Sequence, residues 1–509
     1  MSNSQSSNNK RIAKNTILLY FRMFLTMAIS LYTSRVVLEV LGVEDFGIYN
    51  VVGGLATSFI FFSSSLSNAT QRYFNVEIGK NNTNGISEIF SASLIIYIAL
   101  IVVVVLLSET LGLWFVDNKL TIPIERLDAA KWVFHVTVIG LVLTLISSIF
   151  DSLLIAYENM KIYAYLSIFE AMLKLSIVFL LEYIDFDKLK IYAILFLLSH
   201  LFIRVITVGY CLKKYPVCRF KYVGNIKLFK ALFSFIGWNG FGTAVWMLNE
   251  QGINVILNMF FGPVVNAARG VSAQVGAAVN NFSNNFFTAV RPQIVKSYAG
   301  GDYGYFTKLI NLSSKYSFYL IWFLSLPIIM RSDAILQQWL GNVPDYASEF
   351  VQWILLFNCV NVLTNPFWSG VQAIGNLKKY ILVGSLVFLS AFPISYVFLK
   401  LGYSPVIVFQ ILVSVRIFYL FVTITIFRQL VNFSIVNYFM QVIYPIVKVF
   451  LLSGIFSVLI SPYINNDLLG IILMTFFCLV LTSLTIYAVG ISTEERKFLI
   501  SKIHKLKKE

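Results

Sequence analysis

Residues 89–116 read IFSASLIIYIALIVVVVLLSETLGLWFV, and Glu109 is the single charged side chain in this stretch. A helix needs about 20 apolar residues to cross a hydrocarbon core of about 30 Å. The stretch is therefore long enough to span a membrane, and it is too apolar for the surface of a soluble protein. Comparable stretches recur along the whole chain, so this pattern decides the class of fold.

The composition extends this conclusion to all 509 residues, of which 58% are hydrophobic and 12% are charged. Soluble proteins carry about 25% charged residues. No long hydrophilic stretch remains that could fold as a separate soluble domain. The sequence therefore predicts an all-α polytopic membrane protein with about 14 transmembrane helices. We place these spans at residues 15–37, 46–69, 89–116, 132–156, 162–183, 190–212, 231–261, 270–290, 312–331, 350–375, 380–400, 403–427, 438–460 and 467–490.

The net charge of +15 has two possible explanations. A basic chain can bind the phosphates of a nucleic acid, or it can carry Lys and Arg in cytoplasmic loops because these residues set membrane topology. If the N-terminus is cytoplasmic, about 25 of the 39 Lys and Arg residues fall in inner segments and about 8 in outer loops. This bias explains the charge without a nucleic-acid partner, and it predicts that both termini face the cytoplasm.

A basic segment divides the spans after the sixth, which predicts two lobes of six helices each. A shift of 220 residues aligns Gly42 with Gly262, and the matched second and eighth spans are both unusually polar. Transporters commonly arise from such repeats, with the substrate path at the repeat interface. We expect an N-lobe at residues 1–212, a cytoplasmic linker at 213–230, a C-lobe at 231–427, and spans 13 and 14 with a basic tail at 428–509.

Polar residues inside a span must face protein or water, because lipid cannot satisfy their hydrogen bonds. For the scattered serines of the second span, packing between helices is the simpler explanation. For the asparagines of the eighth span, which include Asn280 and Asn284, we favour a wet central cavity.

Charged residues inside spans need a partner or a function. Arg22 and Arg416 lack an obvious partner nearby in the sequence, so they either bind substrate or pair with an acid of another helix. Asp151 and Glu250 are acids at membrane depth that could take up H⁺ or Na⁺ for coupling, unless they pair with a membrane arginine. Lys174 differs, because Glu170 precedes it by one helical turn and can neutralise it.

We find no constellation of residues that indicates catalysis. The three histidines are far apart in the sequence, and no Gly-rich phosphate loop follows a strand. The four cysteines show no metal-ligand spacing. The sequence therefore predicts a transporter rather than an enzyme, with no metal and no cofactor apart from a coupling H⁺ or Na⁺.

The N-terminal region carries a motif formed by LYFR at residues 19–22, YTSRVVL at 32–38 and LGVEDFGIY at 41–49. This motif resembles the N-terminal signature of Wzx-type polysaccharide flippases of the multidrug/oligosaccharidyl-lipid/polysaccharide exporter superfamily. The resemblance implies a V-shaped pair of six-helix lobes with two added C-terminal helices. It also implies that the protein flips an undecaprenyl-diphosphate-linked oligosaccharide across the bacterial inner membrane for polysaccharide or lipopolysaccharide (O-antigen) biosynthesis.

The resemblance further implies cationic residues in a central cavity that engage the diphosphate. Arg22 matches the arginine of the first span, and Arg269 resembles an arginine at the start of the eighth span. Because a guanidinium fork can bind a diphosphate bidentately, we expect Arg22, Arg269 and Arg416 to contribute. The expected partners are the lipid bilayer, the lipid-linked oligosaccharide and other polysaccharide assembly proteins.

Two other functions stay open from the sequence. A cation-coupled multidrug exporter on the same fold would favour acidic and aromatic cavity residues over arginines. A membrane polysaccharide polymerase or ligase usually carries a large periplasmic loop with catalytic groups, whereas the outer connections predicted here are short.

Overall fold

The computed structural model describes residues 3–57, 60–80, 82–157, 159–222, 226–375, 378–493 and 495–497. Side chains are described from Met23 onward, except at a minority of positions inside helices. Throughout these ranges the secondary structure is helical and contains no strand. The chain divides into two compact units, Met1–Ala267 and Ala268–Glu509.

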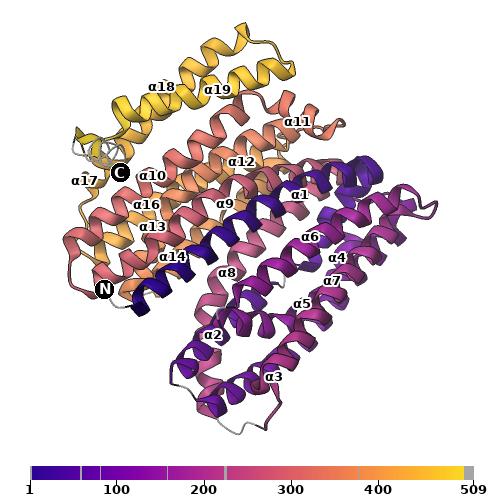
Figure 1. Ribbon diagram of the computed structural model, residues 1–509. Helices are drawn as coiled ribbons and strands as arrows, with labels where there is room; N and C mark the ends of the chain where they lie inside the picture. The colour runs from indigo at the N-terminus through magenta and orange to yellow at the C-terminus, as the bar shows by residue number, and fades with distance from the viewer. Residues whose placement is uncertain are drawn as a thin grey trace. The chain divides into compact units, whose positions relative to one another are not determined.

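The first unit is a bundle in which helices distant in the sequence pack side by side. α5 packs against α7, α1 against α6, and α2 against both α5 and α8 (Figure 1). The helices are α1 (Asn3–Thr57), α2 (Ile60–Gly79), α3 (Thr83–Leu107), α4 (Leu113–Asn118), α5 (Leu127–Ala156), α6 (Met160–Glu182), α7 (Lys188–Lys214), α8 (Ile226–Phe261) and the first residues of α9 (Pro263–Ala299).

The second unit contains the rest of α9 and the later helices. α16 packs against α12, α14 and α15, and α10 packs against α12 and α19, while α18 and α19 lie side by side (Figure 1). The helices are α10 (Tyr303–Met330), α11 (Ser332–Leu340), α12 (Ala347–Asn361), α13 (Asn365–Ile374), α14 (Lys378–Leu389), α15 (Ala391–Lys400), α16 (Val406–Leu430), α17 (Ile435–Tyr438), α18 (Tyr444–Ile460) and α19 (Leu468–Thr485).

Ten helical segments in the described residues are long and apolar enough to cross a membrane. Four more long helices, α2, α6, α8 and α9, have 20, 23, 36 and 37 residues. Large apolar side chains such as Leu106, Leu386 and Phe476 are at least 60% exposed, as expected where the surface meets lipid rather than water. The predicted all-α polytopic membrane fold is confirmed.

Glycines break the helices at two equivalent positions. Gly42 interrupts α1 with φ 78° and ψ 168°, and a second helical segment then continues to Thr57. Gly262, which the shift of 220 residues aligns with Gly42, has φ 77° and separates α8 from α9. Glycine adopts positive φ at little cost, whereas other residues do not. The break at Gly42 lies between the spans predicted at 15–37 and 46–69, in agreement with that division, and the second of these spans covers the end of α1 and the first half of α2.

Candidate functional site

Asp45 of the N-terminal motif anchors an ion cluster in the first unit. Arg126 donates two hydrogen bonds to Asp45, at 2.8 and 2.5 Å, and two to Asp187, at 3.0 and 3.1 Å. Asp187 also caps α7 by accepting the backbone N–H groups of Leu189 and Lys190. Burial disfavours the charged form of Asp187, but Arg126 and these amides outweigh it and hold the pKa of that carboxyl below its ordinary value. The cluster ties α1, α5 and α7 together.

The second segment of α1 packs closely on α8 and on the start of α9. A Cβ atom at Gly47 would lie 1.8 Å from the carbonyl oxygen of Pro263. Asn254 Nδ2 donates to the carbonyl of Asn50 at 3.2 Å, and Asn266 Nδ2 donates to Asn254 Oδ1 at 2.7 Å. Motif residues 45 and 47, together with residue 50 directly after the motif, thus lie at contacts between helices in this structure.

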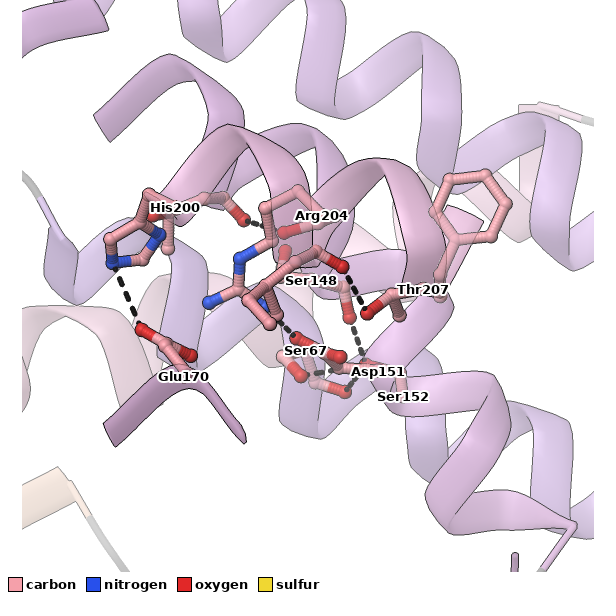
Figure 2. Close-up of polar contacts among 12 residues, drawn as sticks. Ser67, Ser148, Asp151, Ser152, Glu170, His200, Arg204 and Thr207 are labelled. Atoms are coloured by element: carbon pink, nitrogen blue, oxygen red, sulfur yellow. Dashed lines mark hydrogen bonds and ion pairs between the residues drawn. The ribbon is translucent and has the colours of Figure 1, made fainter. Parts of the chain in front are cut away.

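A charged network lies inside the first unit, between α5, α6 and α7 (Figure 2). Arg204 Nη1 of α7 donates to Asp151 Oδ2 of α5 at 3.0 Å. The side chains of Arg204 and Asp151 are 18% and 25% exposed. The sequence left two roles open for Asp151, and in the structure it pairs with a membrane arginine.

The second half of the network centres on one carboxylate oxygen. Lys174 Nζ lies 2.7 Å from Glu170 Oε1, so the predicted ion pair along α6 is confirmed. His200 Nε2 of α7 lies 3.5 Å from the same oxygen (Figure 2). Lys174 Nζ also sits 4.6 Å from the ring centroid of Phe196, a favourable cation–π distance.

Hydroxyl groups surround the Asp151 side of the network. The hydroxyl oxygens of Ser67 and Ser152 are 2.6 Å apart, which joins α2 to α5 (Figure 2). Those of Thr70 and Ser93 are 3.1 Å apart, which joins α2 to α3. The contact of Ser67 agrees with the packing role expected for the serines of the second span.

In the second unit, two of the predicted arginines lie at α16: Arg269 of α9 contacts this helix, and Arg416 is part of it. Arg269 is 4% exposed, and its guanidinium carbon lies 5.4 Å from the ring centroid of Phe409. Arg416 donates from Nη2 to Thr364 Oγ1 at 2.8 Å and lies 4.6 Å from the ring centroid of Tyr419. Positions 409 and 416 are two helical turns apart, so they share one face of α16 at a spacing of about 10.5 Å.

The other predicted site residues have separate environments. Asn280 Nδ2 donates to Asn358 Oδ1 at 2.7 Å, which joins α9 to α12. Asn284 is exposed, and Glu250 is half-buried on α8. The side chain of Arg22 lies outside the described residues.

Sequence reasoning did not identify His200 and Arg204 as parts of one network. The available signal was a repeated spacing, because residues 170 and 174 and residues 200 and 204 are both four apart on consecutive spans. Residues four apart share a helix face. Two such pairs of charged or titratable residues therefore indicate a polar stripe on each of the two helices, and these stripes could have been predicted to face each other. Among the described residues, no group of three or more His, Cys, Asp or Glu side chains could hold a metal ion.

Solved transporter structures share the fold of this chain. A multidrug resistance MATE family transporter of the MOP superfamily, in an inward-facing conformation, matches with a TM-score of 0.67 and 13% identity, covering 81% of this chain and 97% of that one. The lipid II flippase MurJ, in an inward closed conformation, matches with a TM-score of 0.67 and 14% identity, covering 94% and 99%. At these identities the likeness shows the fold.

Comparison with curated protein sequences finds no match. The family described as polysaccharide biosynthesis protein matches residues 12–298, which is more than half of the 509 residues. That range contains the whole motif at residues 19–49, so the resemblance drawn from the sequence is confirmed, and this chain belongs to the polysaccharide biosynthesis protein family.

Proposed function

We propose that this protein flips an undecaprenyl-diphosphate-linked oligosaccharide from the cytoplasmic to the periplasmic leaflet of a bacterial inner membrane. The observation that carries the proposal is the family match over residues 12–298. The fold shared with a lipid II flippase over 94% of the chain supports it. Both termini face the cytoplasm in this proposal, and the protein transports its substrate without acting as an enzyme.

The arginines supply the chemistry for holding a diphosphate. Arg416 forms no ion pair with a carboxylate in the part of the chain that the structure describes, and its contacts are Thr364 and aromatic rings. A guanidinium fork with neutral neighbours keeps its attraction for a phosphate. Arg269 is buried at the same face of α16, so binding there requires a conformation that exposes it. Arg22 is the third proposed contact.

The oligosaccharide needs hydrogen-bonding groups rather than charge. We assign this role to Asn280 and Asn284 of α9, of which Asn284 is exposed. Asn280 is engaged with Asn358 in this structure, so binding a sugar hydroxyl would exchange one hydrogen bond for another. The prenyl tail stays in lipid.

Substitution of Arg416 tests the function. In a flippase-deleted strain, Arg416→Ala should abolish surface polysaccharide while the protein still inserts at a normal level. Arg416→Lys keeps the charge but loses the fork, so it should restore export only in part. The matched control is Lys448→Ala, which removes a membrane cation of α18 that lies 3.9 Å from the ring centroid of Tyr444. This control should export normally.

Export and protein abundance are measured together, by polysaccharide staining and by immunoblot. Normal export by Arg416→Ala would refute the proposed role of this arginine. Failure of the wild-type chain to restore any polysaccharide, at normal abundance, would refute the flippase function itself.

A multidrug exporter is the second candidate, because the MATE family transporter matches the fold with the same TM-score of 0.67. The family match favours the flippase. Drug accumulation in an efflux-deficient strain separates the two, since a multidrug exporter would lower intracellular dye and leave polysaccharide unchanged.

Outward transport of an anionic substrate needs an energy source, and we propose an H⁺ or Na⁺ gradient. Asp151 and Glu250 are the acids that the sequence put forward for this role. We also propose that other polysaccharide assembly proteins act with the flippase at the membrane.

A further inference from the structure

His200 lies near the middle of its helix. It follows Lys188 by 12 residues and precedes Lys214 by 14, which corresponds to about 18 and 21 Å from the two ends at 1.5 Å per residue. A titratable group at such a depth is costly and is usually functional. Figure 2 shows its ring facing Glu170 across the boundary between α7 and α6.

The charges around His200 balance. Asp151 pairs with Arg204, and Glu170 pairs with Lys174, so the four charged groups sum to zero when the imidazole is neutral. Of the five groups, histidine is the one whose ordinary pKa allows it to change charge between pH 5 and 8. Protonation of His200 would therefore give the network one net positive charge.

The two ring nitrogens of His200 have different environments. Nε2 lies 3.5 Å from Glu170 Oε1, whereas Nδ1 is buried and makes no hydrogen bond within the described part of the chain. A neutral imidazole carries a proton on one nitrogen and a lone pair on the other. With the N–H at Nε2 directed to the carboxylate, the lone pair is left on Nδ1. Nδ1 is thus the atom that can accept a proton.

Groups from every helix packed around His200 shape this site. α5 contributes Asp151 and α6 contributes Glu170 and Lys174, while Arg204 lies one turn along α7. The ring centroid of Phe196 lies 5.8 Å from that of His200 and 6.4 Å from that of Tyr49 on α1.

We propose that His200 Nδ1 binds and releases the proton that drives transport, and that Glu170 stabilises the resulting imidazolium. This inference rests on the proposed flippase function and names its coupling site. The proton enters from the periplasmic side, adds one charge to the balanced network and leaves to the cytoplasm as the substrate moves outward. Asp151 has a supporting role, because it neutralises Arg204 next to the site.

His200→Gln tests this assignment, because Gln keeps an N–H donor for Glu170 but does not titrate. We expect substrate-dependent proton movement to fall at least tenfold while abundance stays normal. The matched control is His135→Gln, which removes another histidine that pairs with a glutamate, Glu109, at 3.1 Å, but whose side chain is 45% exposed. This variant should behave as wild type.

The measurement uses the full-length protein in proteoliposomes with a pH-sensitive dye inside, and the probe is the lipid-linked oligosaccharide extracted from the flippase-deleted strain. Export in cells is recorded in parallel. If wild type restores export but moves no protons, or if His200→Gln moves protons normally, the coupling site is wrong and the flippase function stands. If wild type restores no export, the proposed function fails instead.

Discussion

Replacement of Gly47 by Ala should lower the stability of the first unit. The new Cβ atom would lie 1.8 Å from the carbonyl oxygen of Pro263, whereas a carbon–oxygen contact needs about 3.3 Å. The α1 segment must therefore move by about 1.5 Å relative to the start of α9. Because the obstacle is backbone, no side-chain rotation relieves it. Overpacking of this kind costs about 1–3 kcal/mol.

Gly53→Ala is the matched control on the same helical segment, because a Cβ atom at Gly53 meets no atom within 4 Å. Replacing a helical glycine by alanine stabilises by about 0.5–1 kcal/mol, so the two variants should shift stability in opposite directions. Thermal unfolding of the purified protein, followed by fluorescence-detected size exclusion, measures both. If Gly47→Ala proves as stable as Gly53→Ala, the close contact between α1 and Pro263 is wrong.

Further predictions concern other parts of the chain. Glu495→Gln should destabilise the second unit by about 3 kcal/mol, because Lys315, whose side chain is 6% exposed, would lose its charged partner at 2.7 Å. Thermal unfolding measures this loss, and a Lys315→Met/Glu495→Gln double variant should recover most of it. Glu495 is partly buried, but Lys315 and the backbone N–H of Ser492 hold the pKa of its carboxyl below the ordinary value of 4.5. The pair therefore stabilises the protein above about pH 4.5, and this contribution is lost as the pH falls through the lowered pKa, so the Gln variant should show a weaker acid dependence. For topology, an alkaline phosphatase fusion after Asp185 should be active and one after Tyr215 inactive; the reverse result would overturn the orientation inferred from charge.

The fold class could be predicted from the sequence because the length and polarity of a span are local properties. Residues 89–116 are apolar enough to identify a membrane helix without any knowledge of its neighbours. The division between the first two spans could be predicted in the same way, but the positive φ of Gly42 could not, because a glycine in a helical pattern gives no sign of its φ. The recurrence at Gly262 became informative only when both φ values were known.

The candidate site shows the same limit. The pair Glu170 and Lys174 could be predicted because both residues lie on one helix, one turn apart. The pair Asp151 and Arg204 could not be predicted, because 53 residues separate them in the sequence. Only the packing of α5 on α7 brings them together. One residue of the motif that indicated the family, Asp45, connects helices, so part of a family motif can serve the packing of the fold.

Among the described membrane cations, those that face a carboxylate differ from Arg416 in what they can bind. Lys174 and Arg204 each face a carboxylate, so their fields are largely cancelled and an external phosphate gains little from them. Arg416 faces a hydroxyl group and aromatic rings, which solvate a cation without neutralising it. Its charge therefore remains available to an anion that enters the second unit. A change of charge in the charged network of the first unit, by contrast, requires a change of protonation, which we propose occurs at His200.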